Sequence, residues 1–115
     1  MKLIFKGHDA RYAVEQSLLA FFPQERPVYD PAAREENWAA VSLSCGSQYT
    51  TSVTQICYNG SRGKGIARVI IDPAADEYEK ERLRQRAVKL SFFKAARQVT
   101  GVTPSWGALT GIRPA

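Results

Sequence analysis

Three strand-like segments in direct succession constrain the fold of this chain more than any other feature. Residues 38–45, WAAVSLSC, alternate in part between apolar and polar side chains, and residues 50–58, TTSVTQICY, are rich in β-branched side chains. Asn59-Gly60 follows, a dipeptide that tolerates the positive φ angles of a tight hairpin turn. Residues 66–72, IARVIID, form the third segment. Consecutive strands joined by short turns predict an antiparallel sheet.

Helix-like segments lie on either side of these strands. Residues 9–22, DARYAVEQSLLAFF, carry apolar side chains at helical spacing, with Asp9 as the expected N-cap. A loop with three prolines then runs to about residue 37. The second helix is expected to start at Asp72-Pro73 and to continue to about Thr100, where Gly101 supplies the stop.

Residues 1–5, MKLIF, have the composition of a short first strand, so the expected order is β-α-β-β-β-α. This order predicts an α+β two-layer domain over residues 1–101, an antiparallel sheet with two helices on one face. The chain has 115 residues, 44% of them hydrophobic, which is enough for one core. It contains no run long enough to span a membrane, and the apolar start is too short for a signal peptide. We therefore expect a cytoplasmic protein.

The formal charge of +5 raises the question of a nucleic-acid partner. Residues 76–97 hold four acidic and seven basic side chains, with the acids first, an order that suits the helix dipole and a solvated helix. The element order also matches the double-stranded-RNA-binding domain, which places lysines at the start of its second helix. This chain has ADEYEKE there, so the sequence disfavours nucleic acid and keeps a freestanding basic binding module as the alternative function.

The second helix carries two apolar stripes. Leu83, Ala87, Leu90 and Phe93 share one side, and the other is formed by Val88, Phe92, Ala95 and Val99. A surface helix normally needs a single stripe. Two interpretations of the second stripe stay open: it is an interface for a missing domain, exposed in this chain and able to support dimerisation, or the proline loop or the tail covers it.

Catalytic and metal-binding patterns are weak in this sequence. Cys45 and Cys57 lie in strand-like runs and are expected to be buried, unbridged thiols, and with a single histidine, His8, they do not form a usual metal site. Nothing brings His8 together with a nucleophile and an orienting acid. The GSRGKG segment lacks the spacing of a phosphate-binding loop and fits a hairpin better.

Residues 104–114, PSWGALTGIRP, are the most specific motif in the chain. They resemble the segment PWGxLTGIRPxK of the coproporphyrinogen dehydrogenase-like (HemZ-type) radical SAM proteins, where it joins an N-terminal domain to the catalytic barrel. The similarity covers residues 100–114, and the opening KLIFKGHDARY also fits that family's N-terminus. In the family a lysine follows the final proline of this motif. Here the last residue is Ala115, so the motif is cut at that point.

The resemblance implies an accessory domain, not catalytic alone, of an oxygen-independent coproporphyrinogen III oxidase-like oxidoreductase of porphyrin and haem biosynthesis. The parent would use S-adenosylmethionine and a [4Fe-4S] iron-sulfur cluster held by Cys-x3-Cys-x2-Cys, which two cysteines twelve positions apart cannot supply. Its partners would be the parent's own C-terminal domain and a porphyrinogen substrate. Residues 102–115 would form the connector, whose contact residues serve as an interdomain latch or touch substrate: Trp106, Thr110, Ile112 and Arg113.

Overall fold

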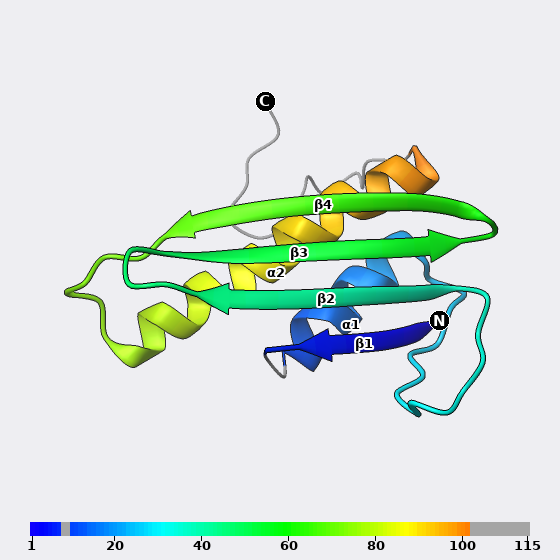
Figure 1. The fold of residues 1–115 in the computed structure, drawn as a ribbon, viewed down its shortest axis with the longest axis horizontal. Coiled ribbons are helices and arrows are strands. Elements are labelled where there is room, and N and C mark those ends of the chain that lie inside the picture. The colour runs from blue at the N-terminus through cyan, green and yellow to red at the C-terminus, as the bar shows by residue number, and fades with distance from the viewer. Residues whose placement is uncertain (8–9, 102–115) are drawn as a thin grey trace.

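The computed structural model describes residues 1–7 and 10–101, which form a four-stranded sheet with two helices on one face (Figure 1). The elements follow the predicted order: β1 (Lys2–Lys6), α1 (Arg11–Phe21), β2 (Trp38–Cys45), β3 (Tyr49–Tyr58), β4 (Ser61–Ile70) and α2 (Glu77–Thr100). Both helices lie behind the sheet in Figure 1, and the other face of the sheet is turned to the viewer. The predicted α+β two-layer class is confirmed. Neither of these helices combines the length and the apolar character needed to cross a membrane.

The direction of β1 differs from the prediction, because β1 runs parallel to β2 and makes the sheet mixed. The pairs β2–β3 and β3–β4 are antiparallel, as expected. A parallel neighbour requires a crossover connection. Here α1 and the loop of residues 22–37 return the chain to the end of the sheet where β1 starts, which places Trp38 beside Lys2.

Local sequence signals at turns and helix ends are mostly confirmed. Asn59 and Gly60 have φ angles of 50° and 83°, and β4 starts directly after them, so the SRGKG segment belongs to the strand. Gly101 ends α2 in the left-handed conformation, with φ of 70°. The N-cap of α1 is Ala10, and the expected cap, Asp9, lies outside the described residues.

The start of α2 was predicted four residues too early. Asp72 closes a turn before the helix, where its carboxylate accepts a hydrogen bond from the backbone N–H of Ala74 at 2.9 Å. Asp76 is the actual N-cap and accepts a hydrogen bond from the backbone N–H of Glu79 at 2.8 Å. Asp76 and Glu79 have the spacing of a capping box, which explains why the later aspartate takes this role.

Close contact between α2 and the sheet depends on two glycines of β4. A Cβ atom added to Gly65 would stand 2.1 Å from the carbonyl oxygen of Ser91, and one added to Gly63 would stand 2.3 Å from that of Ala95. The backbone of α2 therefore lies directly against the backbone of β4, an approach that only glycine permits.

A buried hydroxyl cluster joins α2 to β3. The Oγ of Ser91 lies 2.8 Å from the Oγ of Ser52 and 2.7 Å from the Oγ1 of Thr54, and it donates to the carbonyl oxygen of Val88. All four residues are buried. Because each hydroxyl has a partner, the polar inner face of β3 is compatible with the core.

The face of α2 that was predicted to be an interface for another domain forms part of this domain's own core instead. Val88, Phe92 and Ala95 are fully buried, and Val99 is partly buried against them. The two helices lie side by side on one face of the sheet, so α2 contacts both the sheet and α1. The ring of Phe21 in α1 lies 6.5 Å from the ring of Phe92 between centroids, at a tilt of 47°. Ala95 and Val99 lie against β4. This stripe is therefore covered by the sheet and by α1 within the domain itself.

Side chains of α2 cover part of the outer edge of β4. Gln98 accepts a hydrogen bond from the backbone N–H of Lys64 at 3.0 Å and donates to the carbonyl oxygen of the same residue at 2.8 Å. The ammonium group of Lys94 donates to the carbonyl oxygen of Ile66 at 2.9 Å. Capped backbone groups are less able to pair with a strand of another chain, which is the usual hazard of an edge strand.

Replacing Gln98 with alanine is therefore expected to expose this edge. We predict a loss of about 1 kcal/mol in the free energy of unfolding and more concentration-dependent self-association. Urea unfolding and light scattering over a concentration series measure the two effects. Gln24→Ala, at an exposed loop position, is the control and should change neither. Equal behaviour of the two variants would contradict the capping role of Gln98.

Candidate functional site

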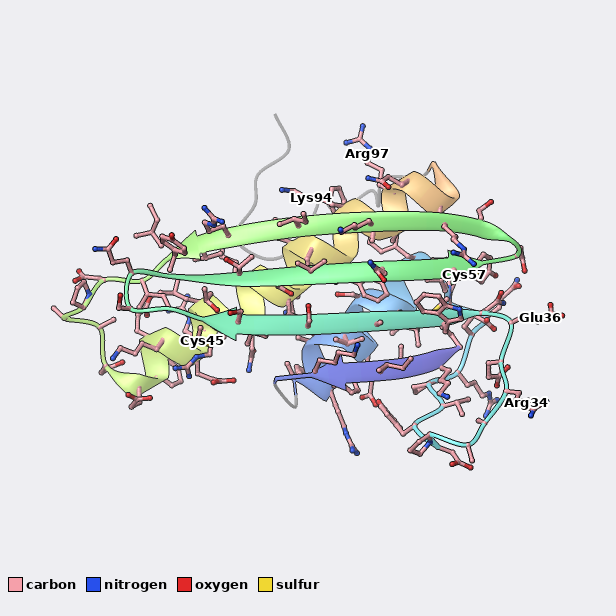
Figure 2. The ribbon with its side chains drawn as sticks, viewed as in Figure 1. Arg34, Glu36, Cys45, Cys57, Lys94 and Arg97 are labelled. Carbon is pink, nitrogen blue, oxygen red and sulfur yellow. The ribbon has the colours of Figure 1, made fainter. Side chains whose placement is uncertain are left out.

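The two cysteines do not form a site. Cys45 pairs with Thr50 at one end of the β2–β3 hairpin, and Cys57 pairs with Trp38 at the other. Figure 2 shows the two cysteines at opposite ends of the sheet. Both are free thiols, as expected, but Cys45 is exposed and Cys57 is half-buried, so the expectation of two buried thiols was wrong. Their separation does not fit a cluster that requires three neighbouring thiolates.

Metal-ligating and catalytic groups are also scattered. The described residues contain no group of three or more His, Cys, Asp or Glu side chains that could hold a metal ion. The predicted connector residues, Trp106, Thr110, Ile112 and Arg113, lie outside the described residues, as does His8. The structure therefore neither brings these residues together nor separates them.

The face of the sheet opposite the helices can be assigned from strand register, because directly paired residues point to the same face. Gly63 and Gly65 meet α2, so the alternate residues of β4 point to the other side. The residue pairs between neighbouring strands then identify the residues of β1, β2 and β3 that lie on this open face with those of β4. The open-face residues are Lys2, Ile4 and Lys6 of β1; Trp38, Ala40, Ser42 and Ser44 of β2; Tyr49, Thr51, Val53, Gln55 and Cys57 of β3; and Arg62, Lys64, Ile66, Arg68 and Ile70 of β4.

Charge on this open face is of one sign. Five of its side chains are basic, Lys2, Lys6, Arg62, Lys64 and Arg68, and none is acidic. The basic residues lie on the outer strands, and small or uncharged side chains occupy most of the centre. Large apolar side chains are also exposed on β4. Ile66 is 51% exposed and Ile70 is 79% exposed.

Tyr49 adds an aromatic ring to this face. It is 41% exposed, and the guanidinium carbon of Arg68 lies over the ring at 4.6 Å from its centroid. This arrangement is a cation–π contact. It places a planar cation over the face of an aromatic ring where β3 starts and β4 ends.

A basic hollow lies on the other side of β4, between the strand and the C-terminal half of α2. It has a volume of about 790 Å³ and is lined by Lys64, Gly65, Ile66, Phe93, Lys94, Arg97 and Gln98, with no acidic residue. In Figure 2, Lys94 and Arg97 project beyond the edge of β4. Within the described residues, neither Lys64 nor Arg97 makes an ion pair. Basic side chains therefore lie on both sides of this strand.

A second hollow, of about 460 Å³, lies at the opposite edge of the sheet. Its walls include Lys2, Arg34, Glu35, Glu36 and Trp38. The ammonium group of Lys2 is already engaged by the carbonyl oxygens of the loop, at 2.8 and 3.1 Å. Because two carboxylates line this hollow, an anionic ligand is favoured at the β4 edge instead.

The first turns of α2 are electrostatically self-contained. Three of its basic residues pair with acids one turn earlier: Lys80 with Glu77, Arg82 with Glu79, and Arg84 with Glu81. The hydrogen bond to Glu81 raises the pKa of Arg84 above its already high ordinary value. These exposed pairs contribute little to stability, but they account for the basic residues at the start of the helix, as expected for a solvated helix.

We name the cationic strip along the fourth strand, formed by Arg62, Lys64, Arg68, Lys94 and Arg97, the β4 basic surface. Sequence reasoning missed this surface because it read SRGKG as part of a turn. A signal was present, since the sequence positions of Arg62, Lys64 and Arg68 differ by two and by four. Such spacing places them on one face of a strand.

Comparisons with known proteins add no family assignment. The chain matches no family model and no curated protein. Among solved structures it is similar to the crystal structure of protein VC0702 from Vibrio cholerae, with 13% sequence identity and a TM-score of 0.43. The similarity covers 76% of this chain and 70% of that one. At this level it carries no argument about function.

Proposed function

We propose that this chain is the N-terminal accessory domain of a cytoplasmic radical SAM oxidoreductase of the coproporphyrinogen III oxidase-like class. The observation that carries the proposal is the sequence of residues 100–114, TGVTPSWGALTGIRP. This string resembles the family's connector in both residue identity and order. In a connector, Trp106 and Ile112 would provide apolar anchors, and Arg113 would bind a carboxylate or a backbone carbonyl.

An accessory role is compatible with the chemistry of the described residues. The apolar stripe of Val88, Phe92, Ala95 and Val99 packs within the domain. The exposed β4 basic surface contains neither a nucleophile nor an acidic side chain. In this proposal, S-adenosylmethionine and the [4Fe-4S] cluster are held by residues that follow position 115, where the catalytic domain would lie. The parent's substrate would be a porphyrinogen, and the catalytic domain would be the main partner of this one.

Reading the coding sequence beyond the codon for Ala115 tests this proposal. We expect the reading frame to continue with a lysine soon after the Arg113-Pro114 pair and to encode Cys-x3-Cys-x2-Cys further on. A stop codon directly after Ala115 would overturn the proposal. So would a longer frame without the three-cysteine motif. Either result would favour the competing hypothesis of a freestanding basic binding module.

A further inference from the structure

We propose that the β4 basic surface binds single-stranded nucleic acid. The proposal does not rest on the enzyme assignment, because an accessory domain and a freestanding module could both carry such a surface. The strip runs along both sides of β4, with Arg62, Lys64 and Arg68 on the open face of the sheet. Arg97 lines the hollow on the helix side together with Lys94, whose ammonium group also donates to the carbonyl oxygen of Ile66.

The β4 basic surface is complementary in charge to a phosphate backbone. No acidic side chain belongs to the open face of the sheet or to the hollow beside β4. Lys64 lies at the centre of the strip and takes part in both. Phosphate groups repeat along a nucleic-acid strand and are neutralised by such rows of lysine and arginine. Same-face side chains on a strand stand about 6.7 Å apart, so Arg62 and Lys64 are neighbours on the open face, and Ile66 stands between Lys64 and Arg68.

The surroundings of the cations favour nucleic acid over an acidic protein. Protein interfaces tend to exclude lysine and other charged groups from their centre, whereas Lys64 is central here and exposed. Beside the cations lie Tyr49, Ile66 and the half-buried Phe93. Bases of a single strand stack on exposed aromatic rings regardless of sequence.

A single strand fits this surface better than a duplex. Its bases are unstacked and can lie on an open sheet next to Tyr49. Glu77 and Glu79 crowd the first turn of α2, which leaves the start of that helix unsuited to the phosphates of double-stranded RNA. The acidic residues that disfavour nucleic acid belong to that helix start and not to β4.

Fluorescence anisotropy with a labelled poly-uridine RNA of about 16 nucleotides tests the proposal on the 115-residue chain. We expect a Kd on the order of 10⁻⁵ M at about 50 mM salt, with steep weakening toward about 200 mM. The double variant Arg62→Gln/Lys64→Gln should bind about tenfold more weakly. The slope of log Kd against log salt should fall by about 1.4, since each lost phosphate contact contributes about 0.7 for single strands.

A matched variant controls for net charge. Arg26→Gln/Arg34→Gln removes the same charge from exposed positions in the loop at the β1 edge, and Figure 2 shows Arg34 far from β4. This variant should keep the Kd within about twofold and the salt slope unchanged, because its residues lie outside the strip. Circular dichroism confirms that both variants are folded.

A second pair of variants tests the aromatic contact. Tyr49→Ala should weaken binding about fivefold or more at every salt concentration, because stacking is largely independent of salt. Tyr12→Ala removes a tyrosine that is 68% exposed on α1 and should leave binding unchanged.

Three results would each overturn the proposal. The first is no anisotropy change at about 50 mM salt with the folded wild-type chain. The second is an equal loss of affinity in the two double variants, which would show that only net charge matters. The third is competition by poly-glutamate as strong as that by unlabelled RNA at matched charge, which would assign the surface to an acidic protein partner.

Discussion

Replacing Gly65 with alanine is expected to destabilise the domain by about 3 kcal/mol or more. The added Cβ would stand 2.1 Å from the carbonyl oxygen of Ser91 and 2.7 Å from the backbone nitrogen of Ala95. Both atoms belong to the helix backbone, so the clash cannot be relieved by a side-chain rotation. Relief requires α2 to move away from β4, which would also separate the hydroxyl cluster of Ser91 from β3.

Thermal and urea unfolding of the Gly65→Ala variant measure this effect. Gly46→Ala is the control, because its Cβ would come no closer than 3.1 Å to a backbone atom of Tyr49. We expect that control to change stability by less than about 1 kcal/mol. If the two variants unfold at the same urea concentration, α2 does not lie directly on β4 and the described helix–sheet contact is incorrect.

Replacing Phe92 with alanine is expected to cost about 3–5 kcal/mol. Phe92 heads the fully buried side chains by volume, and its ring lies 6.5 Å from that of Phe21 and 6.4 Å from that of Phe22, measured between centroids. Truncation leaves a cavity where both helices meet the sheet. A typical domain is stable by about 5–15 kcal/mol, so the variant should be partly or wholly unfolded near body temperature.

Tyr78→Ala serves as the control for Phe92→Ala. Tyr78 lies on the same helix and is 75% exposed, so its truncation should change stability by no more than about 0.5 kcal/mol. Chemical unfolding of the isolated 115-residue chain measures both variants. A neutral effect of Phe92→Ala would restore the hypothesis that this side of α2 faces another domain.

Local signals explain how much of the fold was predictable from sequence. Asn59-Gly60 and Gly101 both mark positions of positive φ, and the structure places a hairpin and a helix end there. The order of strands and helices followed from such signals and from residue patterns. The late start of α2 shows their limit, because Asp72 and Asp76 are both suitable caps and the capping-box spacing of Asp76 decides between them.

Features that depend on contacts distant in sequence were not predictable. The direction of β1 follows from where the crossover through α1 delivers Trp38, which no pattern within residues 1–6 reports. The second apolar stripe of α2 is covered by two elements, because Ala95 and Val99 lie against β4 and Phe92 contacts α1. Sequence periodicity reveals that a face is apolar, but it does not reveal which element covers it.

The basic site was partly predictable. The net charge was visible in the composition, but its location was assigned to α2, where ion pairs with Glu77, Glu79 and Glu81 engage three of the basic residues. The exposed strip on β4 emerged only when the strand register placed Arg62, Lys64 and Arg68 on one face.

The most direct test of the proposed function is an anaerobic assay of the complete protein encoded by the reading frame that contains this chain. We predict a bound [4Fe-4S] cluster, measured as iron and sulfide, and S-adenosylmethionine-dependent release of carbon dioxide from coproporphyrinogen III. Replacing the three motif cysteines should abolish both, and the 115-residue chain alone should show neither. A complete protein without a cluster and without S-adenosylmethionine-dependent turnover would contradict the assignment.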